Sequence, residues 1–188
     1  MKPTAYIKST AYIIAAGLLA IPSGGVLAQG SHARSRAGIS TLDKSYLKDT
    51  AQSNLEEVQF APVVMSHATN SQDRQFGRQM KQDHGKANAD LKRLASRVGD
   101  KLPADVSEDQ KALMNKLSHL HGAKFEAAYK QEMIRDHTED IAKTKREISL
   151  GQNPLVKANA QKNLILLQMH LKMSQALPSS GAKNVPGT

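Results

Sequence analysis

From Leu42 onward, apolar residues recur every three or four positions, which is the spacing of one face of an α-helix. The sequence has no convincing run of alternating β-branched residues of the kind that forms strands. The pattern therefore predicts helices over about 42–68, 71–98, 107–120, 123–149 and 153–177. Pro62 falls inside the first of these helices, where it removes one backbone hydrogen bond, so we expect a kink there.

Local signals at the expected helix ends support these boundaries. Asn70 is a good N-cap residue, and Gly99 can adopt the left-handed conformation that ends a helix. Ser107 and Gln110 have the spacing of a capping box, and Pro154 suits the first turn of a helix. Long amphipathic helices with short loops bury their apolar faces against one another. We therefore expect an all-α, antiparallel four-helix bundle of the ferritin-like type, with an extra short helix between the second and third long helices.

The first 28 residues have the pattern of a secretory signal peptide. Lys2 and Lys8 form a positive region before an apolar stretch at 11–21, and residues 26–28 (Val-Leu-Ala) have the small residues of a cleavage site. The apolar stretch is about half of the roughly 20 residues that span a bilayer, so we expect no transmembrane helix in the mature protein. These features predict an exported protein, with the periplasm as its destination.

The remaining chain divides into three expected parts. Small and polar residues at 29–41 indicate a flexible leader. The helical pattern at 42–177 forms the bundle domain, and residues 178–188 follow it as a disordered tail.

The chain carries a net charge of +9 and has no cysteine. Disulfides therefore contribute nothing to its stability. Its basic residues are scattered and have no interleaved aromatic residues, and an exported protein does not meet nucleic acid, so we expect no nucleic-acid partner. A basic surface outside the cytoplasm can instead bind anionic lipid headgroups or polysaccharides of the envelope.

Three histidines fall alone in the middle of apolar helical stripes: His84, His137 and His170. Two of them follow the pattern Met-x-x-Asp-His, with Met80 and Met133 one helical turn before the imidazole. A titratable ring on a core-facing stripe costs free energy unless a partner binds it. The three rings therefore mark a candidate site inside the bundle.

Four stretches carry a resemblance to a known family. They lie at 54–58, 76–88, 129–137 and 170–171, and they include both Asp-His pairs and the late histidine. Over 42–177 the chain resembles the exported, ferritin-like bacterial family catalogued as domain of unknown function 4142. The resemblance implies a signal peptide followed by a ferritin-like bundle, and it implies no established activity. Two positions depart from the family pattern: Pro62 replaces an ordinary helix former, and Lys145 stands where members often carry a glutamate.

The three histidines have the chemistry of a transition-metal site, with copper, zinc or iron as candidate ions. His84, His137 and His170 are the expected ligands, and Glu57 is the expected carboxylate ligand. Thioethers would favour Cu(I), whereas zinc would use the imidazoles with a carboxylate. The candidate soft ligands are Met80, Met133 and Met173. No Glu-x-x-His pair occurs, which argues against a di-iron ferroxidase centre.

A metal-free hydrogen-bond network around the rings is the alternative interpretation. Its expected members, which could equally orient the rings around a metal, are Asp83, Asp136, Asn88 and Asp140. The protein would then be a structural or envelope-stress module whose basic surface binds anionic envelope components. Gly-x-Ser-x-Gly and phosphate-binding loops do not occur, so both interpretations expect binding and not catalysis.

Overall fold

The computed structural model describes residues 38–178, and all regular secondary structure within them is helical. The signal peptide expected at 1–28, the leader up to residue 37 and the tail from 179 onward lie outside the described residues. No helix in the described range is long and apolar enough to cross a bilayer. The helices are α1 (Thr41–His67), α2 (Ser71–Val98), α3 (Glu108–Ser118), α4 (Gly122–Leu150) and α5 (Pro154–Ala176).

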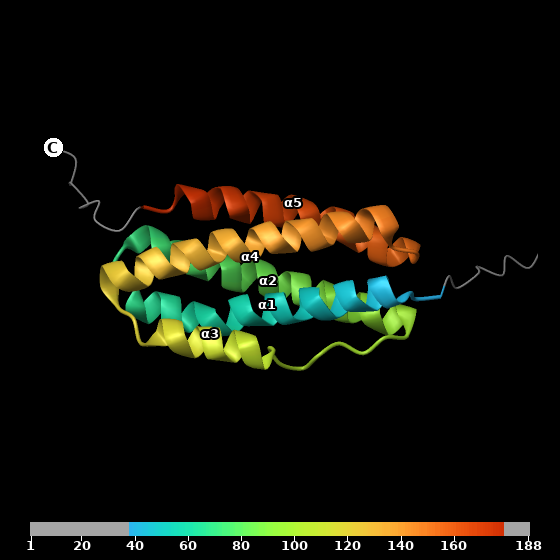
Figure 1. Cartoon of the computed structure of the whole chain (residues 1–188), viewed down its shortest axis with the longest axis horizontal. Coiled ribbons are helices and arrows are strands. Elements are labelled where there is room, and N and C mark those ends of the chain that lie inside the picture. The colour runs from blue at the N-terminus through green and yellow to red at the C-terminus, as the bar shows by residue number, and fades with distance from the viewer. Residues whose placement is uncertain (1–37, 179–188) are drawn as a thin grey trace, which may run out of the picture. The chain divides into compact units, whose positions relative to one another are not determined.

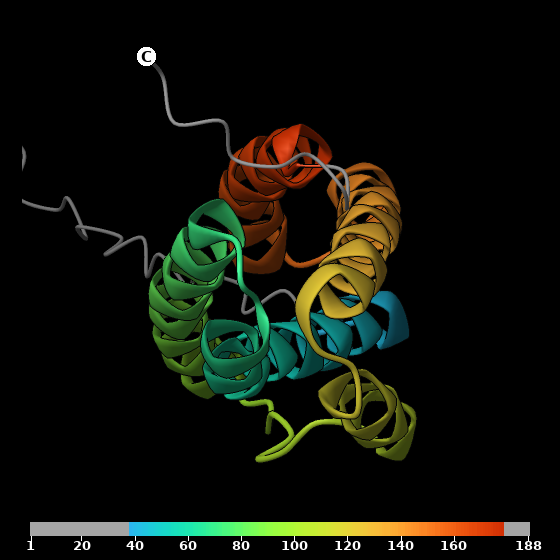
Figure 2. The same ribbon diagram turned by 90° about the vertical axis from the view of Figure 1, so that its left-hand side faces the viewer.

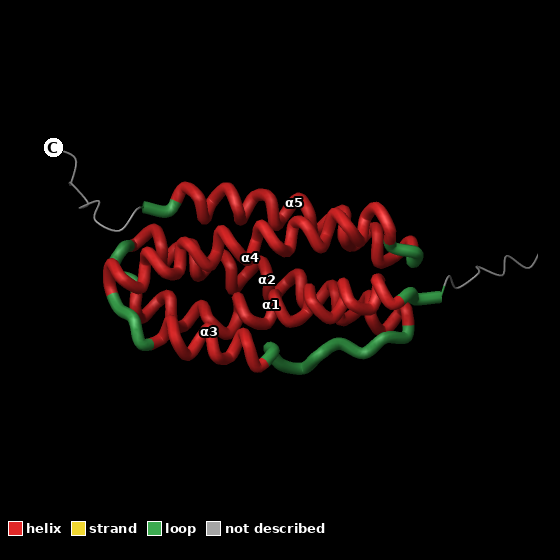
Figure 3. The backbone as a smooth tube through the Cα atoms, viewed as in Figure 1, coloured by secondary structure: helices red, strands yellow, loops and turns green. Residues whose placement is uncertain are grey.

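The four long helices pack side by side as two hairpins (Figures 1 and 2). α1 pairs with α2 and α4 pairs with α5, and the hairpins meet along α1–α4 and α2–α5. The short helix α3 and the loop before it run along the outside of the bundle, so α4 starts near the α1–α2 turn (Figure 3). The all-α bundle with an extra short helix is therefore confirmed. A single long connection of this kind also occurs in ferritin-like bundles.

The helix boundaries follow local capping chemistry. Ser40 and Asp43 form a capping box at the start of α1, which begins one residue before the expected boundary at 42. Asn70 caps α2 through its side chain, and Gly99 ends that helix with φ of 76°. Pro62 lies inside α1 as expected, and the kink there stays a prediction.

Two apolar clusters fill the bundle, one toward each end. The first contains Phe60, Val64, Phe76, Met80, Phe125, Tyr129 and Met133. The second contains Tyr46, Leu47, Ala51, Leu91, Val156 and Ala160. The helix segments between the two clusters carry buried polar side chains, including all three candidate histidines. The polar layer is therefore closed off by apolar packing on both sides along the bundle.

Candidate metal centre

Three buried imidazoles meet in the layer between the apolar clusters. His84 comes from α2, His137 from α4 and His170 from α5, and each is at most 1% exposed. The ring centroids are 5.7 Å apart for His84 and His137, 5.0 Å for His84 and His170, and 5.5 Å for His137 and His170. One nitrogen of each ring lies within 4.8 Å of a nitrogen of the other two. The fold thus brings together three donors from helices far apart in the sequence.

The tautomer of His137 is fixed by its own helix. Its Nδ1 lies 2.9 Å from the carbonyl oxygen of Met133. A carbonyl oxygen only accepts hydrogen bonds, so Nδ1 donates its proton and Nε2 keeps a lone pair. This Nε2 atom is buried and has no hydrogen-bond partner among residues 38–178. An unsatisfied buried acceptor costs about 1–3 kcal/mol, so a ligand on Nε2 would be favourable.

The other two rings are oriented by oxygen acceptors. His84 Nδ1 lies 2.8 Å from Asn54 Oδ1, and His170 Nε2 lies 2.9 Å from Asp83 Oδ2. If both of these nitrogens donate, the remaining two carry lone pairs and face each other, with His84 Nε2 3.2 Å from His170 Nδ1. Two lone pairs at this distance repel unless a cation lies between them. A metal-free pair needs a proton between these two nitrogens. Either the Asn54 amide is reversed, so that Asn54 donates to His84 and His84 donates to His170, or His170 carries a proton on both nitrogens and donates to Asp83 and to His84.

Burial favours the neutral form of all three rings. It lowers the pKa of His84 well below the usual 6.5, and the neighbouring His137 and His170 lower it further. It also lowers the pKa of His137 to about 4. For His170 the effect of burial outweighs the opposing effect of the Asp83 carboxylate, so the pKa is lowered there too. At neutral pH the rings therefore keep the lone pairs that metal coordination requires.

The spacing of the paired nitrogens matches a metal site of known dimensions. Metal–nitrogen bonds of about 2.0–2.1 Å at a tetrahedral angle place two ligand nitrogens about 3.3 Å apart. The observed separation of His84 Nε2 and His170 Nδ1 is 3.2 Å. Three imidazoles around one point can hold a borderline ion and leave a further coordination position for another ligand.

A second group of candidate ligands adjoins the first. Glu57 on α1, with Asp136 and His137 on α4, offer atoms within 4.8 Å of one another. Glu57 is buried and its Oε1 has no hydrogen-bond partner in the described part of the chain. Burial, and then the nearby Asp136 charge, raises the pKa of Glu57 well above its usual value. Glu57 thus lies beside His137, in a group that contains neither His84 nor His170.

The other candidate residues lie around these two groups. Asp83 contacts His170, as described, whereas Asp140 accepts hydrogen bonds from Ser53 at 2.5 Å and from Lys143 at 3.3 Å. Asn88 is buried one turn after His84, and its Oδ1 has no hydrogen-bond partner within residues 38–178. The methionines line the first apolar cluster: Met80 and Met133 belong to it and Met173 packs against it.

Asn54 is the site residue that the sequence analysis missed as a candidate. Its side chain is buried on α1 and orients His84, whose other ring nitrogen faces His170. A signal was present, because Asn54 lies seven residues after the core residue Leu47 and therefore on the same helix face. A polar amide on that face needs a buried partner, just as the histidines do.

Residues 28–177 match the family described as Domain of unknown function (DUF4142). The chain belongs to this family. The DUF4142 match covers the whole bundle, including both groups of candidate ligands. A search of the curated proteins found no match.

Two solved structures share the fold of this DUF4142 protein. One is a DUF305 fragment from Deinococcus radiodurans, with a TM-score of 0.64 and 14% identity over 73% of this chain and 95% of that one. The other is a DUF305 protein from Streptomyces coelicolor, described as secreted, with a TM-score of 0.59 and 17% identity over 71% of this chain and 89% of that one. At such low identity the likeness shows the fold alone.

Proposed function

We propose that this protein binds a transition-metal ion through His84, His137 and His170. The buried Nε2 of His137 carries the proposal, because its lone pair is fixed by the Met133 carbonyl and has no hydrogen-bond partner among the described residues. The short contact between His84 Nε2 and His170 Nδ1 supports it, because two lone pairs at this distance repel and a cation between the nitrogens removes that repulsion. Asp83 and Asn54 would orient the ligands from behind, an arrangement common around metal-bound histidines.

The donor set favours a borderline ion. Imidazole nitrogens with a carboxylate nearby suit Zn(II), Cu(II) and Fe(II). Met80 and Met133 fill the adjoining apolar cluster, where core packing already accounts for them. We therefore favour a divalent ion over Cu(I), and we regard the activity as binding or sensing of the ion, without turnover.

We also infer that the protein acts outside the cytoplasm. The sequence pattern of residues 1–28 is that of a secretory signal. The structurally similar Streptomyces coelicolor protein is described as secreted. An exported binder would meet metal ions that enter the cell envelope.

Metal analysis of the protein purified without a histidine tag tests the proposal. We expect about one ion of Zn(II), Cu(II) or Fe(II) per chain after incubation and dialysis, because each of the three rings offers a ligand atom within 4.8 Å of the other two. Bound ion should raise the melting temperature by about 5–10 °C when free metal exceeds its dissociation constant a hundredfold.

The control is His119→Gln, because His119 is exposed and lies outside both ligand groups. It should bind metal as the wild type does, whereas the triple variant His84→Gln, His137→Gln, His170→Gln should lose the response. A metal content below about 0.1 equivalent, with no thermal response to any of the three ions, contradicts the proposal. The same result with strong destabilisation of the triple variant would favour the metal-free network.

A further inference from the structure

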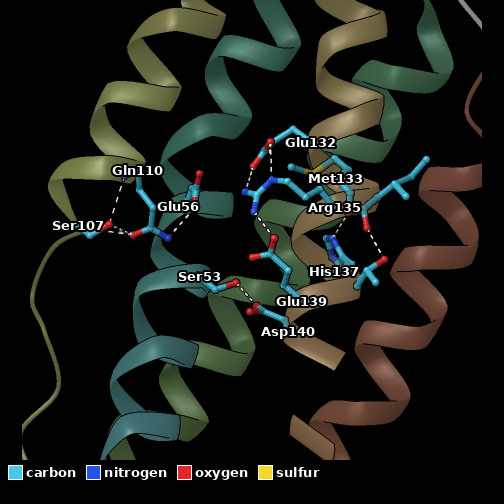
Figure 4. A network of polar contacts seen from close by, with 12 residues as sticks. Ser53, Glu56, Ser107, Gln110, Glu132, Met133, Arg135, His137, Glu139 and Asp140 are labelled. Atoms are coloured by element: carbon cyan, nitrogen blue, oxygen red, sulfur yellow. Dashed lines mark hydrogen bonds and ion pairs between the residues drawn. The ribbon is translucent and has the colours of Figure 1, made fainter. Parts of the chain in front are cut away.

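An acidic groove of about 330 Å³ lies between α1, α3 and α4. Six acidic and two basic side chains line it, although the chain as a whole carries a net charge of +9. Both basic residues are engaged: Arg135 pairs with Glu132 and Glu139 (Figure 4), and Lys143 pairs with Asp140. A groove with such an acidic excess concentrates cations from solution.

Four carboxylates in the groove have no ion pair within residues 38–178: Asp49, Glu56, Asp109 and Asp136. Glu56 accepts a hydrogen bond of 2.5 Å from Gln110 on α3, so the short helix holds this carboxylate in the groove wall (Figure 4). Asp136 is partly exposed and belongs both to the groove and to the group with Glu57 and His137. It therefore connects the surface of the molecule to the buried histidines.

Two buried acceptors stand behind Asp136 without a partner in the described structure: Glu57 Oε1 and His137 Nε2. Both residues are at most 3% exposed, and each offers an atom within 4.8 Å of the other and of Asp136. Two carboxylates and one imidazole are a common ligand set for divalent first-row metal ions. The unsatisfied acceptors make this a second place where a cation would be stabilised.

His137 belongs to both ligand groups but can serve only one ion at a time. Its Nδ1 is occupied by the Met133 carbonyl, so Nε2 alone is available for coordination. An ion bound with Glu57 and Asp136 therefore excludes an ion bound by His137 together with His84 and His170. One ion can therefore occupy the two positions one after the other, but two ions cannot occupy both at once.

We propose that Glu57, Asp136 and His137 form a loading position for a divalent transition-metal ion, reached through the acidic groove and emptied into the three-histidine centre by way of His137. This inference rests on the proposed function. It adds the route by which the ion reaches the three-histidine centre and specifies that the ion is divalent. Carboxylates receive the hydrated divalent ion, and the imidazoles, which such ions bind more strongly, then retain it.

Stopped-flow binding of Co(II) to the metal-free chain tests this route, with the visible absorption of bound Co(II) as the signal. In the variant Glu57→Gln, Asp136→Asn we expect both loading and release to slow by about tenfold or more, since the route lacks its carboxylates. The equilibrium affinity should change far less, because the three histidines remain. Glu139→Gln is the matched control, because it removes one charge from the same groove without touching the ligand group.

A second variant examines the loading position by itself. In His84→Gln, His170→Gln the chain should keep one weaker Co(II) site, and adding Glu57→Gln should abolish it. If the double carboxylate variant does not fold, Asp136→Asn alone serves, since that residue is partly exposed. The loading position is contradicted if the carboxylate variants take up Co(II) as fast as the wild type, or if the wild type binds two ions at once. Either result leaves the three-histidine centre intact. Failure of the wild type to bind any ion overturns both.

Discussion

At the scale of single residues, Glu147 shows how burial changes the behaviour of a carboxyl group. It lies on α4 next to Asp43 and its side chain is fully buried. Burial, followed by the nearby Asp43, raises its pKa from 4.5 to about 7. Between these two pH values the Glu147 carboxyl group therefore binds its proton more fully in the native protein than in the unfolded chain.

This difference in proton binding predicts the sign of a pH effect. A raised folded-state pKa contributes stability that is present below pH 4.5 and is lost as the pH rises through about 7. Glu147→Gln should not show this loss of stability. The free energy of unfolding of the variant should therefore rise relative to that of the wild type by up to about 1 kcal/mol per pH unit between pH 5 and 7. Urea unfolding at several pH values measures it, with the exposed Glu139→Gln as control. A pH-independent difference between wild type and variant would contradict the assignment.

At the scale of elements, the contact between α1 and α2 depends on one glycine. A Cβ atom on Gly77 would lie 2.8 Å from Val64 Cγ1, whereas a Cβ on Gly85 of the same helix would lie 3.8 Å from Val58 Cγ2. The first distance is a clash and the second is an ordinary contact. Both glycines are inside α2, where alanine is intrinsically the better helix former.

The two glycines should therefore respond oppositely to alanine. Gly85→Ala should stabilise the protein by about 0.5–1 kcal/mol through helix propensity. Gly77→Ala should destabilise it by about 1–2 kcal/mol, because overpacking outweighs the same gain. Denaturant midpoints measure both changes. Val64→Ala should cost less in the Gly77→Ala background than in the wild type, and strict additivity of the two would show that the clash is not the cause.

At the scale of the whole molecule, each hairpin turn is held by a carboxylate of the other hairpin. Asp43, near the start of α1, accepts hydrogen bonds from the backbone N–H groups of Gln152 at 3.0 Å and Asn153 at 3.1 Å, in the α4–α5 turn. Glu126, near the start of α4, accepts from the N–H groups of Thr69 at 2.8 Å and Asn70 at 2.7 Å, in the α1–α2 turn. These contacts join the two hairpins at opposite ends of the bundle.

Removing either carboxylate should weaken the whole bundle. Asp43→Ala and Glu126→Ala should each lower the free energy of unfolding by about 2–4 kcal/mol, because charge-assisted bonds to backbone N–H groups are lost. The two effects should add, since the contacts lie at opposite ends and share no partner. Urea unfolding tests this, and Glu139→Ala at the surface should change stability by less than about 0.5 kcal/mol. A single local effect, such as loss of α1 alone, would appear as a transition that is not two-state.

Much of the bundle could be predicted because helix periodicity and capping are local properties. The expected helix at 71–98 coincides with α2, and the other helices agree within about two residues. The three histidines could be singled out because each is polar on an apolar stripe. Asn54 is also polar on an apolar stripe, but the sequence indicates it more weakly. The contacts of Asp43 and Glu126 could not be predicted from the sequence, since their partners lie in distant turns.

The sequence by itself determined the elements, their inward faces and the presence of buried imidazoles, because residues three or four apart on a helix share a face. Only the tertiary structure decided which nitrogen each ring presents, since the acceptors Asn54, Asp83 and the Met133 carbonyl are set by helix packing and rotamer. Packing likewise decided that Glu57 stands with Asp136 beside His137. A helix fixes direction around its own axis, but the depth and rotation at which helices meet depend on the packing of all four together.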